Sequence, residues 1–237
     1  MCEMPLNRLS IQGIPALLWG VGTDQAIIAV HGNMSNKEDA VIRLLAEEAY
    51  RHGCQTLSFD LPEHGERSNE GIPCKVQNCV SDLRKVMDYA RSRYRAISLF
   101  ACSMGAYFSL LEYNKEPLGQ ALFLSPVVDM KRIIQNMMLW FGVTEERLKQ
   151  EQQIETPIGQ TLFWDYYRFV LDHPIENWNC ATSILCGTND NLCERDTIDA
   201  FVKKFGCKLE VLQAGEHYFH TPEQLEYYSA WLGKNMR

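Results

Sequence analysis

The chain has 237 residues, of which 46% are hydrophobic and 22% charged, and its formal net charge is -7. This length and composition indicate one globular domain, spanning residues 1–237, with a sizeable buried core, and they exclude an intrinsically disordered chain. The negative charge offers no long-range attraction to nucleic acid or anionic lipid, so the sequence predicts no nucleic-acid partner and no membrane insertion.

The cysteines and the N-terminal stretch indicate where the protein works. The nine cysteines are irregularly spaced and contain no CxxC pair, which is typical of free thiols in a reducing compartment. No histidine stands near Cys74 and Cys79 at the spacing of zinc ligands, so we expect no metal and no other cofactor. The start, MCEMPLNRLS, lacks the basic and apolar regions of a signal peptide. These features predict a cytoplasmic protein without structural disulfides, and they leave its oligomeric state open.

Short apolar runs with the length of buried strands recur along the chain. Two runs around Gly13 predict a leading hairpin, and six further runs follow at 26–30, 56–59, 96–100, 121–124, 183–186 and 209–212. None of them alternates cleanly between apolar and polar residues, as expected for strands covered on both faces. Amphipathic helical patterns lie between the runs. This alternation predicts an α/β fold with a mostly parallel central sheet flanked by helices.

Two helix starts carry recognisable capping signals. Ser35 with Glu38 predicts a capping box ahead of the first helical pattern. Thr221, Pro222 and Gln224 predict the start of the final helix, as a cap, a proline at the first helical position and a partner at the third.

One segment breaks the alternation of strands and helices. Residues 130–180 contain no strand-like run, and their apolar residues form two helical stripes that are rich in Met, Trp and Tyr. An insertion of this size is either additional core or a cap over a pocket, and we expect a mostly helical cap placed over Ser103.

A serine, an acid and a histidine each follow a predicted strand. Ser103 lies in the small-residue stretch ACSMG, Asp190 follows the run at 183–186, and His217 follows the run at 209–212. The carboxyl ends of parallel strands meet at one edge of a sheet, so we expect the three side chains to lie close together. A serine hydroxyl needs a base to take its proton, and the base needs a carboxylate to fix its tautomer. The pattern predicts Ser103 as nucleophile, His217 as base and Asp190 as acid.

These assignments have rivals in the sequence. His220 stands three residues after His217, and Asp190 competes with three other carboxylates near strand ends, namely Glu194, Asp196 and Asp129. Cys102 stands beside Ser103, but a sharp turn exposes only its central residue, so we expect its thiol to point into the packing. His31 and His64 are expected to organise loops through hydrogen bonds to the backbone.

The layout resembles the α/β-hydrolase superfamily over nearly the whole chain. ACSMG is similar to the nucleophile elbow of that family, with Ala101 in place of the usual first glycine. The resemblance implies an oxyanion hole formed by the backbone N–H groups of Asn33, after His31-Gly32, and of Met104. "DLPEHGERS" is similar to a loop found in many such hydrolases, and "LSPVVD" before a helical insertion is similar to capped esterases, including feruloyl-esterase-like and monoacylglycerol-lipase-like members.

The resemblance implies a serine hydrolase that acts on a small-molecule ester with a small or medium acyl or aryl group. Candidate pocket residues in the insertion are Met138, Trp140, Trp164 and Tyr167, which otherwise form the insertion's own core. Cleavage of thioesters or small peptides uses the same triad and stays open. The alternative from a different class is a non-catalytic receptor for a small apolar ligand on this fold.

Overall fold

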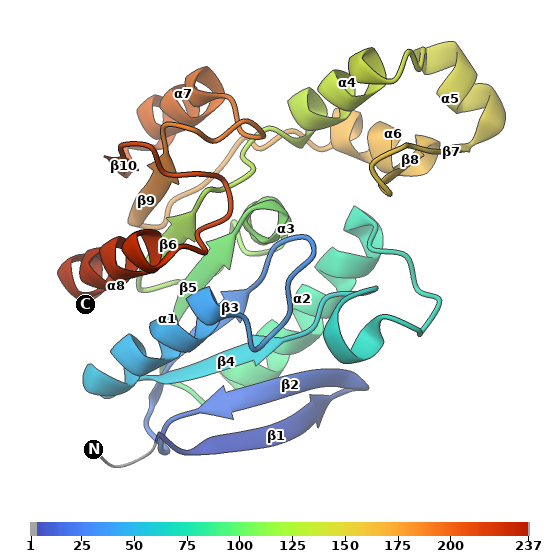
Figure 1. The fold of residues 1–237 in the computed structure, drawn as a ribbon. Coiled ribbons are helices and arrows are strands. Elements are labelled where there is room, and N and C mark those ends of the chain that lie inside the picture. Colours follow the sequence, from blue (N-terminus) through green and yellow to red (C-terminus); the bar gives the residue numbers. More distant parts are fainter. Residues whose placement is uncertain (1–3, 237) are drawn as a thin grey trace.

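Eight strands form one twisted sheet in the computed structural model, which describes residues 4–236 (Figure 1). The strands are β1 (Leu6–Ile11), β2 (Ile14–Trp19), β3 (Gln25–Val30), β4 (Gln55–Phe59), β5 (Ala96–Cys102), β6 (Ala121–Leu124), β9 (Thr182–Gly187) and β10 (Lys208–Leu212). Their order across the sheet is β1-β2-β4-β3-β5-β6-β9-β10. The hairpin β1–β2 and the pair β2–β4 are antiparallel, and every pair from β4 to β10 is parallel. The predicted mostly parallel sheet is confirmed.

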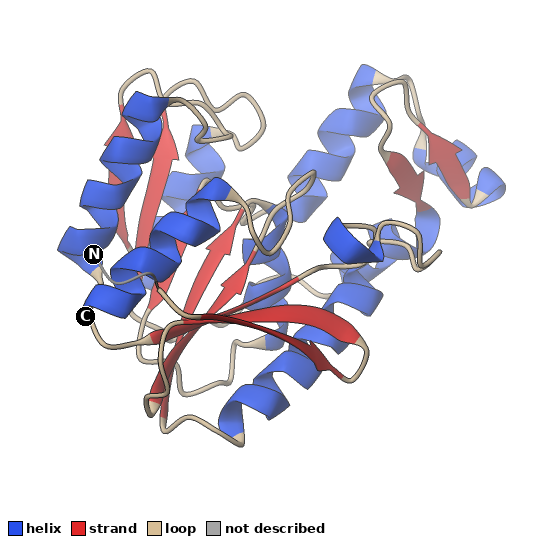
Figure 2. Cartoon of the chain, turned by 60° about the horizontal axis from the view of Figure 1, so that its bottom comes forward, coloured by secondary structure: helices blue, strands red, loops and turns tan. Residues whose placement is uncertain are grey.

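Helices cover both faces of the sheet (Figure 2). One face carries α1 (Ala40–Arg51) and α8 (Pro222–Asn235), and the other carries α2 (Val76–Arg91), α3 (Met104–Glu112) and α7 (Arg195–Phe205). Ile27 and Ala29 of β3 pack with α1 and α8, whereas Ile28 and Val30 pack with α2 and α3. Successive side chains of a strand point to opposite faces, so a strand between two helical layers must be apolar throughout.

A segment inserted between β6 and β9 stands beside the carboxyl edge of the sheet, at the upper right of Figure 1. It contains α4 (Met130–Trp140), α5 (Glu145–Glu151), β7 (Gln153–Glu155), β8 (Thr161–Phe163) and α6 (Trp164–Asp172). The antiparallel pair β7–β8 was not expected from the sequence, because each strand has three residues and only its central one is buried. Lys75, just before α2, contacts α6 through an ion pair with Asp165, Nζ to Oδ2 2.9 Å.

The two capping predictions have different outcomes. The helix α8 begins as expected, with Pro222 in its first turn and the Thr221 side chain accepting from the N–H of Gln224 at 3.3 Å. The capping box at Ser35 is wrong, because α1 begins at residue 40 with Asp39 as its N-cap. The Ser35 hydroxyl instead donates to Asp39 Oδ2 at 2.5 Å. Ser35 therefore holds the capping carboxylate instead of capping the helix itself.

Within residues 4–236, no helix combines the length and apolar character that crossing a membrane requires. The eight cysteines of this part of the chain are free thiols, and the ninth, Cys2, lies outside the described residues, as do the first three residues of the N-terminal stretch.

Candidate active site

Ser103 occupies a sharp turn between β5 and α3. Its backbone angles, φ +49° and ψ -127°, lie in a region that residues with a side chain rarely adopt. Its carbonyl oxygen accepts from the N–H groups of Ala106 (3.1 Å) and Val127 (3.0 Å), which hold the turn in place. A Cβ on Gly105 would lie 2.4 Å from the His31 carbonyl oxygen. Only glycine at position 105 lets α3 begin this close to the end of β3.

Ser103, His217 and Asp190 form a continuous hydrogen-bonded chain. His217 Nε2 lies 2.9 Å from Ser103 Oγ, and His217 Nδ1 lies 2.8 Å from Asp190 Oδ2. The second carboxylate oxygen of Asp190 accepts from the N–H groups of Leu192 (2.9 Å) and Cys193 (2.8 Å). A carboxylate beside Nδ1 keeps the proton on that nitrogen, so Nε2 is free to accept the serine proton. The arrangement can generate an activated hydroxyl.

The three side chains differ in their exposure to solvent. The Asp190 side chain is 4% exposed and that of His217 is 22% exposed, and Ser103 is partly exposed. A nearly buried carboxylate is shielded from water, while the histidine can still exchange protons with a bound molecule or with solvent.

Two loops bring Asp190 and His217 together by a close backbone approach. A Cβ on Gly187, at the end of β9, would lie 2.0 Å from the carbonyl oxygen of Gly215. The N–H of Asn189 donates to that same oxygen at 2.8 Å, and the N–H of Thr188 donates to Leu212 at 3.0 Å. The contact leaves no room for a side chain at position 187, so glycine is required there.

His220 lies away from the serine. Its Nδ1 bonds the Tyr218 carbonyl oxygen at 2.8 Å, its ring stacks on that of Tyr218, and its side chain is 50% exposed beside Glu216. Its N–H bonds Gln224 Oε1 at 3.1 Å. His220 therefore belongs to the start of α8, and the structure brings His217 to Ser103.

The rival carboxylates also have other partners. Glu194 forms an ion pair with Arg132 at 2.8 Å, Asp129 caps α4 by accepting from the Arg132 N–H at 3.0 Å, and Asp196 accepts from the N–H of Thr197 at 3.0 Å. Among the described residues, none of these three carboxylates hydrogen-bonds His217. Asp190 is the acid that the fold places against the imidazole.

Two histidines fix the loop that carries Asn33, as expected. His31 is fully buried; its Nδ1–H donates to the Gly32 carbonyl oxygen at 2.7 Å, and its Nε2 accepts from the Leu61 N–H at 3.0 Å. Burial lowers the pKa of His31 to about 4, which keeps this ring neutral. His64 accepts from the Met34 N–H at 3.1 Å through Nε2.

Two backbone N–H groups, those of Asn33 and Met104, are expected to form an oxyanion hole. Within residues 4–236, neither the backbone N–H of Asn33 nor that of Met104 donates a hydrogen bond. The Asn33 loop runs against the elbow, since a Cβ on Gly32 would lie 2.9 Å from Ser103 Cβ. The Met104 N–H belongs to the first turn of α3, where backbone donors have no partner inside the helix.

A buried ion pair that was not predicted from the sequence holds the loop that carries Asn33 against the loop after β4. Lys37 Nζ lies 2.5 Å from Asp60 Oδ2, with side-chain exposures of 4% and 0%. The N–H groups of Lys37 and Glu66 also donate to this carboxylate, at 2.9 Å and 3.0 Å. Burial opposes the charge of Lys37, but its bonds to Asp60 and Glu66 raise its pKa above the ordinary value. The position of Asp60 directly after β4 was the available signal, and nothing local identified Lys37.

The four candidate pocket residues differ in their surroundings. Met138 and Tyr167 are buried, and the Tyr167 hydroxyl accepts from Gln135 Nε2 at 3.4 Å. The Trp164 ring lies 6.2 Å from that of Tyr167, while Trp140 at the end of α4 is 56% exposed.

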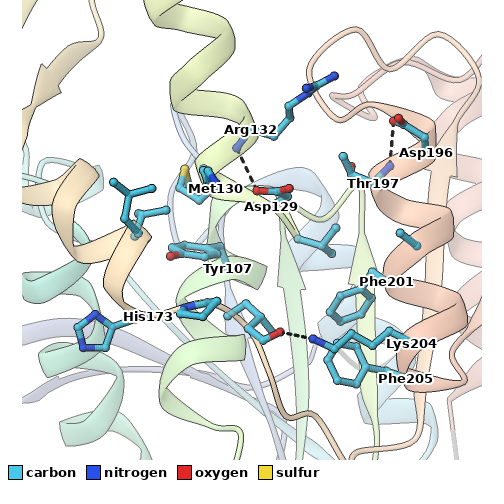
Figure 3. Close-up of a pocket in the computed structure, with 17 residues that line it drawn as sticks. Tyr107, Asp129, Met130, Arg132, His173, Asp196, Thr197, Phe201, Lys204 and Phe205 are labelled. Carbon is cyan, nitrogen blue, oxygen red and sulfur yellow. Dashed lines mark hydrogen bonds between the residues drawn. The ribbon is translucent and has the colours of Figure 1, made fainter. Parts of the chain in front are cut away.

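A groove of about 580 Å³ lies between the inserted segment and α7 (Figure 3). Its lining combines the aromatic residues Phe201 and Phe205 with Asp129 and Lys204, and it includes Tyr107 of α3. The Tyr107 hydroxyl is buried, and within residues 4–236 it has no hydrogen-bond partner. Neither Ser103 nor any of the four candidate pocket residues lines this groove.

The cysteines near the serine are protonated thiols. Burial raises the pKa of Cys102 to about 12, so its thiol is not a nucleophile near neutral pH. Cys193 stands with Asp190 and His217 at a spacing that could hold a metal ion. Burial raises the pKa of Cys193, and a metal binds the thiolate, so the chemistry of this trio does not favour a metal site.

No family model matches the sequence, and no curated protein matches it in sequence. Solved structures match in fold. Est1E from Butyrivibrio proteoclasticus with ferulic acid bound has a TM-score of 0.79 at 19% identity, covering 97% of each chain. Alpha/beta hydrolase domain-containing protein 10 from mouse has a TM-score of 0.76 at 14% identity, covering 97% of each chain. The Pyrococcus furiosus esterase Pf2001 has a TM-score of 0.70 at 16% identity, covering 98% of this chain and 90% of its own. The chain therefore has the α/β-hydrolase fold, as the elbow motif predicts.

Proposed function

We propose that the protein is a serine hydrolase that cleaves carboxylic esters through Ser103, His217 and Asp190. The observation that carries the proposal is the unbroken hydrogen-bonded chain from Ser103 Oγ through His217 to Asp190, at the carboxyl edge of the sheet. The fold that this chain shares with esterases supports the same chemistry. A receptor without catalytic activity has no need for a serine in a strained turn that is aligned with a base.

The reaction follows from the geometry. His217 Nε2 takes the proton of Ser103 while Oγ attacks the acyl carbon, and Asp190 stabilises the imidazolium that forms. The N–H groups of Asn33 and Met104 stabilise the oxyanion, an effect of about 3–4 kcal/mol per donor. His217 then gives its proton to the leaving alcohol. A water activated by the same ring releases the acid from the acyl-enzyme.

The substrate class comes from the inserted segment. We assign residues 130–180 the role of a cap, because they leave the sheet after β6, at the carboxyl edge that also carries Ser103 and Asp190. The partly exposed Trp164 and the exposed Trp140 can contact a substrate and favour a small or medium acyl or aryl group, whereas Met138 and Tyr167 are buried and pack within the segment. The ferulic acid bound to Est1E supports an aryl acid as part of the range. The free cysteines favour a cytoplasmic location.

A fluorophosphonate probe tests the proposal directly, because it forms a covalent bond only with an activated serine. We expect stoichiometric labelling on the tryptic peptide that contains Ser103 and no labelling of Ser103→Ala. A panel of p-nitrophenyl esters of graded chain length then defines the acyl preference. An unlabelled wild-type protein that binds these esters without turnover would support the receptor instead.

A further inference from the structure

Two thiols are in contact at the start of α2, one just before its N-cap residue and one in its first turn. Cys74 precedes the N-cap residue Lys75, and Cys79 is the fourth residue of the helix. Their sulfur atoms lie 3.6 Å apart. Apolar side chains at these two positions commonly pack together and fix the entry of the chain into a helix. Here both side chains are thiols, so the same contact can become covalent.

The surroundings of the two sulfurs differ, and the difference assigns a role to each. Cys79 is completely buried, whereas Cys74 is partly exposed. The hydrogen bond from the Cys79 thiol, together with the nearby imidazole of His64, lowers the pKa of Cys74 to about 6. Burial raises the pKa of Cys79 well above the ordinary value. Cys74 is therefore the accessible thiolate, and Cys79 is a protonated thiol held against it.

The segment that carries Cys74 is a loop. Residues 69–75 contain no helix or strand, and the N–H of Cys74 donates to a side chain, Glu63 Oε2, at 2.7 Å. A disulfide has an S–S distance of about 2.05 Å, so the sulfurs must approach by roughly 1.5 Å. Disulfide formation therefore requires a side-chain rotation with a small shift of this loop.

We propose that Cys74 and Cys79 form a peroxide-responsive thiol pair, in which Cys74 is oxidised first and Cys79 resolves it to an intramolecular disulfide. The oxidant is a hydroperoxide. The Cys74 thiolate attacks its terminal oxygen, the O–O bond breaks as the S–O bond forms, and the departing alkoxide takes a proton from solvent. Cys74 is then a sulfenic acid, oxidised by two electrons, and the peroxide is reduced to an alcohol.

Resolution consumes the second thiol. Cys79 loses its proton and its sulfur attacks the Cys74 sulfur, the S–O bond breaks, and hydroxide leaves with that proton as water. The sum is two thiols and one hydroperoxide giving one disulfide, one alcohol and one water. The site lies next to the loop that carries Asn33, because His64, which contributes to the low pKa of Cys74, accepts from the N–H of Met34.

Peptide mapping of the whole protein tests the proposal, because trypsin cleaves after Lys75 and separates the two cysteines into peptides 68–75 and 76–84. After treatment with a few equivalents of hydrogen peroxide and blocking of remaining thiols, we expect these two peptides to be joined by a disulfide and to separate on reduction. In Cys79→Ser, whose hydroxyl can still donate to Cys74 but cannot form a disulfide, we expect dimedone to trap a sulfenic acid on peptide 68–75. Cys74→Ala should give neither product.

Cys180 and Cys207 are the internal controls, since both are partly exposed and burial raises the pKa of each to about 11. They should stay unmodified at the peroxide dose that converts Cys74. The proposal is overturned if the two peptides stay unlinked while Cys180 or Cys207 is oxidised, or if Cys79→Ser, folded by circular dichroism, yields no dimedone adduct on Cys74.

Discussion

Ser103 holds a backbone conformation that side chains disfavour, and the cause is the position that this conformation gives to the hydroxyl. The positive φ turns the chain from β5 into α3 within one residue, which places Oγ at His217. Such a conformation costs about 1–3 kcal/mol for a residue other than glycine. The fold carries that cost because the bonds to Ala106 and Val127 secure the turn.

Comparing Ser103→Gly with Ser103→Ala isolates this strain. Both variants lack the hydroxyl and should lose turnover by about 10⁴-fold or more. Glycine adopts a positive φ without steric cost, so Ser103→Gly should be more stable than Ser103→Ala by about 1–3 kcal/mol in urea denaturation. An alanine variant at least as stable as the glycine variant would show that the turn is not strained.

The two neighbouring histidines provide a matched pair for the base. His217→Ala removes the group that contacts Ser103 Oγ, so ester turnover should fall by a factor similar to that of Ser103→Ala. His220→Ala changes a ring that is stacked on Tyr218 at the surface, so turnover should stay within a few-fold of wild type. Steady-state kinetics on a p-nitrophenyl ester measures both. Loss of activity in His220→Ala alone would reassign the base.

At the scale of elements, the carboxyl edge of the sheet is assembled by backbone contacts that admit no side chain. The start of α3 meets the end of β3 at Gly105, and the loops after β9 and β10 meet at Gly187. These contacts set the distance between the strand ends that carry the three site residues. The geometry of the site therefore depends on residues that take no part in its chemistry.

Gly105→Ala should disturb the elbow without removing any functional group. Its Cβ would meet the carbonyl oxygens of His31 at 2.4 Å and Val30 at 2.8 Å, both of them backbone atoms. We expect a loss of about 1–3 kcal/mol in stability and a fall of about 100-fold in kcat/KM, since small misplacements of reacting groups are costly. Gly22→Ala is the control, because a Cβ there meets nothing within 4 Å. Equal kinetics in the two variants would contradict the prediction.

Two truncations separate substrate contacts from core packing in the inserted segment. Met138 is buried, so Met138→Ala should cost about 2–5 kcal/mol and leave acyl-chain preference unchanged. Trp164 is partly exposed beside Tyr167, so Trp164→Ala should raise KM and shift chain-length preference with little loss of stability. Melting temperature and the ester panel measure the two effects. If Trp164→Ala only destabilises the protein, the segment is additional core and not a cap.

The sequence predicted those features that depend on residues close together in the chain. Apolar runs identified the sheet strands, because a strand between two helical layers has no polar face. The order of strand ends identified Ser103, Asp190 and His217 as neighbours. The sequence did not reveal Lys37 under Asp60, since a buried ion pair depends on two distant segments. It also misplaced the cap of α1, because both Ser35 and Asp39 suit that role and tertiary packing selects between them.

At the scale of the whole molecule, the buried imidazole of His31 joins the loops that follow β3 and β4. His31 follows β3 and accepts from the N–H of Leu61, which follows β4. Both ring nitrogens are used, one as donor and one as acceptor. Protonation would remove the acceptor and place a charge in a fully buried site. The stability of the fold is thereby linked to pH through one residue.

His31 makes the folded state less stable in acid. Burial lowers its folded pKa to about 4, against about 6.5 in an unfolded chain, so the unfolded state binds a proton first as pH falls. The contribution of His31 is complete above pH 6.5 and is lost as the pH falls toward 4, by about 3 kcal/mol in total.

In His31→Gln, an amide oxygen can accept from Leu61 but takes up no proton. Its stability at pH 7 should be lower, and the difference from wild type should shrink by about 3 kcal/mol between pH 7 and pH 4. Urea denaturation across this range measures it, with His173→Gln as the control because that ring is exposed. A constant difference between wild type and His31→Gln at every pH would show that His31 is not the group that links acid to unfolding.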